Sequence, residues 1–297
     1  MTLRAGEHPV RGAFIYTFGA HEYDLASRTH IMGILNVTPD SFSDGGEFLS
    51  VAKAVDHGLA MAEEGADFID VGGESTRPKG AAYGEGAEPV GVQEELDRVM
   101  PVIEALARGV SVPISIDTYK ADVASHALAA GASIVNDISG FGFDAAMAGT
   151  VGRAGATAVV MHIKGTPKTM QKDPVYDDLF GEIHAFLAGA VRTGEMNGVR
   201  QMLVDPGIGF GKTAADNYRL LAGLSRFGDL GYPVLVGPSR KSFLGSVSGL
   251  PVRDRLEASL AAATSAVLSG AHVVRVHDVR ETRRAVAIAD AVRRVSR

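Results

Sequence analysis

Val234-Leu235-Val236-Gly237-Pro238-Ser239-Arg240-Lys241-Ser242 is the stretch that decides the fold. Apolar residues that favour a β-strand end at a Gly-Pro turn, and two cations flanked by hydroxyl groups follow. The pattern predicts a buried strand whose exit carries Arg240 and Lys241 to the edge of a sheet. Taken alone, the stretch is equally typical of a solvated Lys-Arg pair on a surface turn.

Seven further strand-like runs end in the same way, with polar residues directly after an apolar segment. The eight exits, in chain order, are Asn36, Glu74-Ser75-Thr76-Arg77, Asp117, Asn136-Asp137, His162, Asp205, Ser239-Arg240-Lys241 and Arg275-Val276-His277. Apolar residues at helical spacing follow each run and predict helices over 51–62, 92–107, 121–130, 144–153, 179–192, 214–224, 254–268 and 282–295. Pro101 is expected to bend the second helix or to divide it.

Eight strand–helix units predict an α/β protein with a parallel sheet, because the strands read as continuous apolar runs buried on both faces. In a chain of this length they favour a single closed (β/α)8 TIM barrel spanning residues 1–297, with its active site at the carboxyl ends of the strands. Residues 1–12 are expected to be loose, and residues 14–25 to form a hairpin that plugs the opposite end. The alternative fold is a doubly wound open sheet, but that fold does not explain why the chain has eight strand–helix units.

Composition narrows the class of function. The 29 Lys and Arg against 35 Asp and Glu leave a net charge of −6, so no basic field invites nucleic acid. The absence of cysteine excludes disulfides and thiolate metal sites. No apolar run has the length of a membrane span or of a signal-peptide core. We therefore expect a cytoplasmic protein that binds neither nucleic acid nor membrane.

The eight strand exits would together form the rim of the barrel, and the two parts of this rim differ in chemistry. Exits three to six supply the acceptors and amides Asp117, Asn136 and Asp205 beside apolar Met161, whereas exits seven and eight supply Arg240, Lys241, Arg275 and His277. Each residue alone has an ordinary explanation as a cap or turn residue. Together they predict a ligand with an N–H-rich head of the aminopyrimidinone kind and a phosphorylated part held near the last strands.

Three further features of the sequence bear on ligand binding. The stretch Gly207-Ile208-Gly209-Phe210-Gly211-Lys212-Thr213 is similar to a P-loop, but Pro206 stands where that motif needs its first glycine. It is interpreted as a lid that lays Phe210 against a ring; Lys212 either contacts the ligand or belongs to a structural loop. The histidines lack paired zinc spacing, and Asn36 with substrate phosphates would suit Mg²⁺ or would simply brace the strand end.

Nearly the whole chain resembles the dihydropteroate synthase family, a pterin-binding family of TIM barrels. The resemblance is carried by residues 32–46, Gly73-Glu74-Ser75-Thr76-Arg77-Pro78, Ser115-Ile116-Asp117-Thr118, Asn136-Asp137, residues 205–212, Ser239-Arg240-Lys241-Ser242 and Arg275-Val276-His277-Asp278. It implies a transferase of folate biosynthesis that joins 6-hydroxymethyl-7,8-dihydropterin diphosphate to 4-aminobenzoate, releases diphosphate, and is a target of sulfonamides.

The resemblance also implies roles for individual residues. The pterin would be held by Asp117, Asn136, Asp205, Lys241, Met161 and Phe210, and the diphosphate by Asn36, Arg275 and His277, with Asn36 also meeting Mg²⁺. Catalysis would rest on Lys241, Arg275, His277 and Asn36. The aminobenzoate site would be shaped by Asp40, Phe42, Thr76, Arg77, Pro78 and Ser242. The family suggests a homodimer through the small-residue helix at 258–268, which ordinary core packing explains equally well.

One departure from the family pattern and several alternatives stay open. Lys79-Gly80-Ala81-Ala82-Tyr83-Gly84-Glu85-Gly86 reads as extra loop beside the aminobenzoate side. A corrinoid-type pterin-binding methyltransferase would share the barrel but needs no diphosphate site. A Schiff-base enzyme would use Lys241 as its nucleophile, and an inactive paralogue would bind pterin without turnover.

Overall fold

Eight parallel strands form one sheet in the computed structural model, which describes residues 14–38, 46–75 and 89–295. The strands are β3 (His30–Asn36), β4 (Phe68–Gly72), β5 (Ile114–Asp117), β6 (Ile134–Asp137), β7 (Thr157–Met161), β8 (Met202–Asp205), β9 (Leu235–Val236) and β10 (Val273–Val276). Their order is β8-β7-β6-β5-β4-β3-β10-β9. A parallel bridge between Val204 and Val234, with Val204 N donating to Pro233 O at 3.0 Å, closes the ring. The predicted barrel is confirmed.

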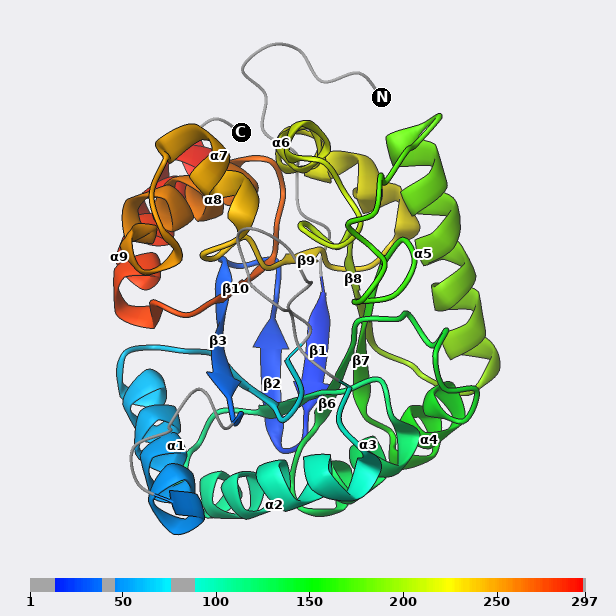
Figure 1. Cartoon of the computed structure of the whole chain (residues 1–297), viewed down its shortest axis with the longest axis vertical. Helices are drawn as coiled ribbons and strands as arrows, with labels where there is room; N and C mark the ends of the chain where they lie inside the picture. Colours follow the sequence, from blue (N-terminus) through cyan, green and yellow to red (C-terminus); the bar gives the residue numbers. More distant parts are fainter. Residues whose placement is uncertain (1–13, 39–45, 76–88, 296–297) are drawn as a thin grey trace.

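Helices surround these strands on the outside (Figure 1). They are α1 (Gly46–Glu63), α2 (Val92–Gly109), α3 (Ala121–Ala129), α4 (Met147–Ala154), α5 (Leu179–Met196), α6 (Ala214–Ala222), α7 (Ser242–Ser248), α8 (Leu256–Leu268) and α9 (Val279–Val295). The short α7 and the 3-10 turns η2 (Leu224–Leu230) and η3 (Val252–Asp254) were not predicted. Each is a brief addition between β8 and α8, and none alters the alternation of strand and helix.

Pro101 neither ends nor divides α2. Proline removes one backbone hydrogen bond from a helix interior, which normally breaks or kinks it. Here, however, Val99, Val102, Ile103 and Leu106 are fully buried on one face of the same helix. Packing of that apolar face against the barrel therefore outweighs the local penalty.

The strand side chains alternate between two cores. One set of alternate residues, such as Ile69, Val135 and Val274, packs with the helices. The other set points into the barrel, where Met32, Phe68, Ile134, Val159, Leu203, Leu235 and Val273 form a separate apolar cluster near the strand starts. This alternation follows from the two-residue period of a strand.

A hairpin of β1 (Ile15–Phe18) and β2 (His21–Asp24) covers the apolar end of the barrel, as predicted. Tyr16, Phe18 and Leu25 belong to the interior cluster, and the hairpin lies in the middle of the ring of helices in Figure 1. The Tyr16 hydroxyl also donates to Met202 O at 2.8 Å. The plug leaves the opposite end, at the carboxyl ends of the strands, for a functional site.

Candidate active site

Polar side chains replace the apolar ones two residues further along the same strands. Phe68 is followed by Asp70, Ile134 by Asn136, Leu203 by Asp205, and Val273 by Arg275. Because strand side chains alternate, each of these pairs points to the same interior. The polar layer therefore lies directly above the plugged apolar layer.

Arg275 links three strands of this layer. Its Nε donates to Asp70 Oδ2 at 2.5 Å, and its Nη2 donates to Asp117 Oδ2 at 2.6 Å. Asn136 Nδ2 also donates to Asp70 Oδ2, at 2.9 Å. Residues far apart in sequence thus form one hydrogen-bonded group on β4, β5, β6 and β10.

Asp205 and Lys241 stand on the neighbouring wall. Asp205 Oδ1 accepts from Gly207 N at 2.7 Å, which begins the glycine-rich loop after β8. Gly207 has φ +71°, and a Cβ there would lie 1.9 Å from His162 O, so only glycine fits. The loop carries Phe210, whose ring centroid is 4.6 Å from Lys241 Nζ, and Lys241 donates to Ile208 O.

Lys241 and Arg240 point to different partners. Arg240 adopts φ +57°, and its Nε donates to Asp278 Oδ2 at 3.1 Å. Buried Arg255 holds the same turn, with its Nη1 donating to Arg240 O at 3.2 Å and to Lys241 O at 3.3 Å. The expectation of three cations on one wall is therefore corrected: Arg240 is paired with Asp278, whereas Lys241 joins the group around Asp205.

Lys212 makes contacts within the protein that hold the glycine-rich loop. It is buried, and its Nζ donates to Phe210 O and interacts with His162 Nδ1, both at 2.9 Å. Burial and the nearby cation lower the pKa of His162 to about 2, so its neutral ring accepts from Lys212. Met161 packs below with Ile163 and Phe210 in a small apolar cluster. Lys212 therefore braces the loop that carries Phe210.

The remaining described rim residues lie at β3 and β10. Asn36 is half-buried at the end of β3, in register with Gly72. His277 follows β10, and its Nδ1 is 3.0 Å from Ser239 Oγ. Ser242 is the first residue of α7. Asp40, Phe42, Thr76, Arg77 and Pro78, together with the extra loop at 79–86, lie outside the described residues.

Burial favours the neutral forms of the Asp117, Asp205 and Lys241 side chains. It raises the pKa of Asp117 to about 7, against the opposing charge of Arg275 and with the help of Asp70, Glu95 and Asp137. It raises the pKa of Asp205 against the opposing charge of Lys241. It lowers the pKa of Lys241 to about 8, although Asp205 and Asp117 favour the cation. Such shifts in a polar cluster are typical of functional sites.

Sequence reasoning missed two parts of the site. Asp70 lies inside an apolar strand, whereas the candidate residues were taken from the strand ends. The feature that could have identified it is a charged residue within the apolar run, two positions before Gly72. The second part is Lys120, which pairs with Glu74 after β4 and with fully buried Glu95 of α2. Tyr119 Oη also donates to Glu74 Oε1 at 2.9 Å. These contacts hold the backbone directly before Thr76.

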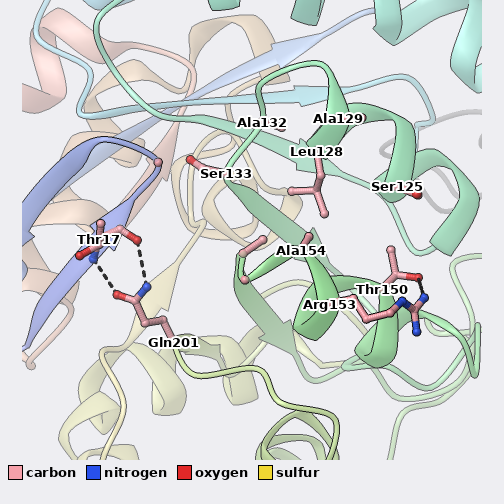
Figure 2. A pocket seen from close by; sticks show the side chains of 13 residues that line it. Thr17, Ser125, Leu128, Ala129, Ala132, Ser133, Thr150, Arg153, Ala154 and Gln201 are labelled. Atoms are coloured by element: carbon pink, nitrogen blue, oxygen red, sulfur yellow. Dashed lines mark hydrogen bonds between the residues drawn. The ribbon is translucent and has the colours of Figure 1, made fainter.

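An open groove of about 640 Å³ lies at the other end of the barrel, between the hairpin, α3 and α4 (Figure 2). Arg153 is the sole ionisable side chain among its lining residues. Gln201 is already engaged, since its Nε2 donates to Thr17 O at 2.9 Å and its Oε1 accepts from Thr17 N at 2.7 Å. The groove lacks a catalytic group, so the rim remains the candidate site.

Fold and rim together define a (β/α)8-barrel enzyme with a cluster of charged side chains at the carboxyl ends of its strands. A family model described as pterin binding enzyme matches residues 32–277. The chain belongs to this family of pterin-binding enzymes.

Within that family, the chain is similar to dihydropteroate synthases over most of its length. It is 46% identical to the Synechocystis enzyme over 273 residues, which cover 91% of this chain and 92% of the relative. The Xanthomonas albilineans enzyme, solved with 4-aminobenzoic acid, has TM-score 0.86 and 43% identity, with 95% of this chain and 98% of that chain covered. Its structure with 7,8-dihydropteroate has TM-score 0.82 and 42% identity, with 93% and 97% covered. The Yersinia pestis enzyme in a sulfonamide drug complex has TM-score 0.87 and 43% identity, with 95% and 100% covered.

Proposed function

We propose that this chain condenses 6-hydroxymethyl-7,8-dihydropterin diphosphate with 4-aminobenzoate to give 7,8-dihydropteroate and diphosphate. The observation that carries the proposal is the convergence of acceptors and cations on one rim: Asp117 accepts from Arg275, Asn136 belongs to the same hydrogen-bonded group, and Asp205 lies near Lys241. Family membership and the ligands of the related structures support the same reaction.

The acceptors suit the head of the pterin. Its amino and ring N–H groups would donate to Asp117, Asn136 and Asp205, since a buried carboxylate left without a donor is unfavourable. Lys241 would meet the carbonyl side of the ring, and Met161 and Phe210 would pack against its faces. The ring would thereby be fixed in position before any bond changes.

Arg275, His277 and Asn36 would hold the diphosphate. The bond between the pterin methylene carbon and the diphosphate oxygen breaks, and the electron pair leaves with diphosphate. The aminobenzoate nitrogen then attacks that carbon and loses a proton to solvent. Catalysis would depend mainly on stabilising the charge that develops as diphosphate leaves, because the reaction needs no nucleophile–base pair in the protein. Ser239 orients the His277 ring through Nδ1.

Mg²⁺ fits the chemistry of the rim. Among residues 14–38, 46–75 and 89–295, no three His, Asp or Glu side chains form a metal-binding group. Mg²⁺ commonly keeps several waters and needs few protein ligands besides substrate phosphates, so the amide oxygen of Asn36 would suffice. Bound there, the ion would neutralise charge on the departing diphosphate.

We further propose that residues 1–297 form one domain and that the protein acts in the cytoplasm as a homodimer. The aminobenzoate site would be shaped by Asp40, Phe42, Thr76, Arg77, Pro78 and Ser242. No helix in the described part of the chain is long and apolar enough to cross a membrane. The homodimer contact would use the small-residue segment 258–268, which lies within α8.

Diphosphate release tests the proposed reaction. We expect release only when the dihydropterin diphosphate, 4-aminobenzoate and Mg²⁺ are present together, and dihydropteroate should form in equal amount. Pterin binding without release would indicate an inactive paralogue. Methyl transfer from a methylated pterin, without any diphosphate dependence, would instead indicate a methyltransferase.

A further inference from the structure

Asp70 lies in the middle of β4, and its side chain is fully buried inside the barrel. In sheet register it stands between Ile34 of β3 and Ser115 of β5. A carboxylate buried among strands is unfavourable unless charged or hydrogen-bonding partners hold it. The partners of Asp70 therefore indicate what the residue contributes.

Both hydrogen bonds of Asp70 reach the same oxygen, Oδ2. Arg275 Nε donates to it at 2.5 Å and Asn136 Nδ2 at 2.9 Å, whereas Oδ1 has no partner among the described residues. Arg275 supplies the charge that makes burial of the carboxylate tolerable. The contact with neutral Asn136 adds little charge compensation, so its consequence is one of orientation.

An ionised carboxylate accepts hydrogen bonds and cannot donate them, so the nitrogen of the Asn136 amide has to face Asp70. One of its two N–H groups is used by Asp70. The carbonyl oxygen Oδ1 and the second N–H remain, side by side and in a fixed order. Within the described chain no residue donates to that Oδ1.

We propose that Asp70 is a specificity-determining positioning residue: it fixes the Asn136 amide and thereby sets the order of acceptor and donor that residue 136 offers to a ring. The inference rests on the proposed function. The matching ring edge places an amino N–H opposite Oδ1 and a ring-nitrogen acceptor opposite the N–H, as the 2-aminopyrimidin-4-one edge of a pterin does. Pteridine-2,4-dione has the reversed edge, with N1–H beside the 2-carbonyl. Its carbonyl oxygen would face the acceptor Oδ1, and its N1–H would face the N–H of the amide.

The test compares two ligands on one protein. Calorimetric Kd values for pterin and for pteridine-2,4-dione give a discrimination ratio, which should strongly favour pterin in the unaltered protein. In Asp70→Asn the amide of Asn136 is free to turn over, because its neighbour can now donate as well as accept. We expect the ratio to fall about tenfold or more.

Asp67→Asn is the matched control. Asp67 is also a buried, ion-paired carboxylate: Arg28 Nη2 donates to its Oδ1 at 2.6 Å, and Ile31 N donates to its Oδ2 at 2.8 Å. It lies before β4, at the plugged end, so its replacement should lower stability and leave the ratio unchanged. A role of Asp70 in stability alone would make the two variants behave alike.

The double variant Asp70→Asn with Asn136→Asp covers the case in which Asp70→Asn does not fold. It keeps the net charge and a carboxylate near Arg275, yet residue 136 then has acceptors only, so discrimination should again be lost. A ratio unchanged in a folded Asp70 variant overturns the inference. Failure of the unaltered protein to bind pterin would instead overturn the proposed function.

Discussion

The two ends of the barrel interior use the same strands for opposite purposes. Near the strand starts the inward residues are apolar and pack with Phe18 and Leu25 of the hairpin region. Two positions further along they become Asp70, Asn136 and Arg275, joined by hydrogen bonds. A single step of the strand period thus separates an apolar layer that stabilises the fold from the polar layer to which we assign ligand binding. Mutations in the two layers should affect different measurements.

The largest effect is expected at the plug. Phe18 is 1% exposed and contacts Tyr23 and Phe68 edge-on. Phe18→Ala should lower the free energy of unfolding by about 3–5 kcal/mol, as for other buried phenylalanines. Urea denaturation of the variant and of the unaltered protein measures this difference. Turnover per folded molecule should stay near that of the unaltered protein. Ile15→Ala, at a side chain that is 58% exposed, is the control. A large drop in turnover with intact stability would break the comparison.

At the rim, Lys241→Ala and Arg275→Ala should each reduce turnover about 10²-fold or more, as expected for loss of one preorganised electrostatic contact. Steady-state kinetics with both substrates measures the loss. The two variants should differ in stability: Arg275→Ala removes two ion pairs, to fully buried Asp70 and to Asp117, whereas Lys241→Ala removes the hydrogen bond to Ile208 O and the positive charge near Asp205. Near-normal turnover in both would contradict the assignment.

The pH profile of kcat/KM for the pterin substrate sharpens the comparison further. Asp117 has its pKa raised to about 7, so below that pH it becomes protonated and accepts poorly. Lys241 has its pKa lowered to about 8, so above that pH it loses its charge. We expect a bell-shaped profile that falls about tenfold per pH unit beyond either limb. Asp117→Asn should flatten the acid limb, and Phe18→Ala should leave both limbs in place.

The smallest effect belongs to the hydroxyl of Tyr16. Tyr16→Phe removes the hydrogen bond to Met202 O and keeps the ring, so the free energy of unfolding should fall by about 1 kcal/mol. Thermal or urea unfolding measures it, and the kinetic constants should not change. A pH profile altered by this substitution would show that the two layers are coupled.

The periodic part of the fold was predictable from sequence. Continuous apolar runs with polar exits indicate parallel strands, and the hairpin at 14–25 followed from Phe14, Tyr16 and Phe18 at alternate positions. Helix ends differ by a few residues, because caps and final turns depend on packing. The extra helix α7 was missed, since its Gly and Ser content reads as loop.

The contacts of the candidate site were less predictable than its members. Asp117, Asn136 and Asp205 were marked because they end strands, but their partners depend on register between segments far apart in the chain. Arg275 and Asp117 are 158 residues apart, and no local pattern pairs them. The turn of Arg240 toward Asp278 likewise follows from its left-handed backbone. Asp70 was overlooked because a single charge within an apolar strand carries no motif.

The short strand β9 has a consequence for how the barrel wall responds to ligand. Its two residues leave the junction with β8 fastened by the Val204–Val234 bridge, while neighbouring pairs such as β3 and β4 share five registered residues. Higher up, Lys241 joins the two sides by its bond to Ile208 and its position over Phe210. A ligand that draws Lys241 away loosens this seam from the top. The backbone amide protons of residues 207–211 should then show the largest change in hydrogen–deuterium exchange on binding.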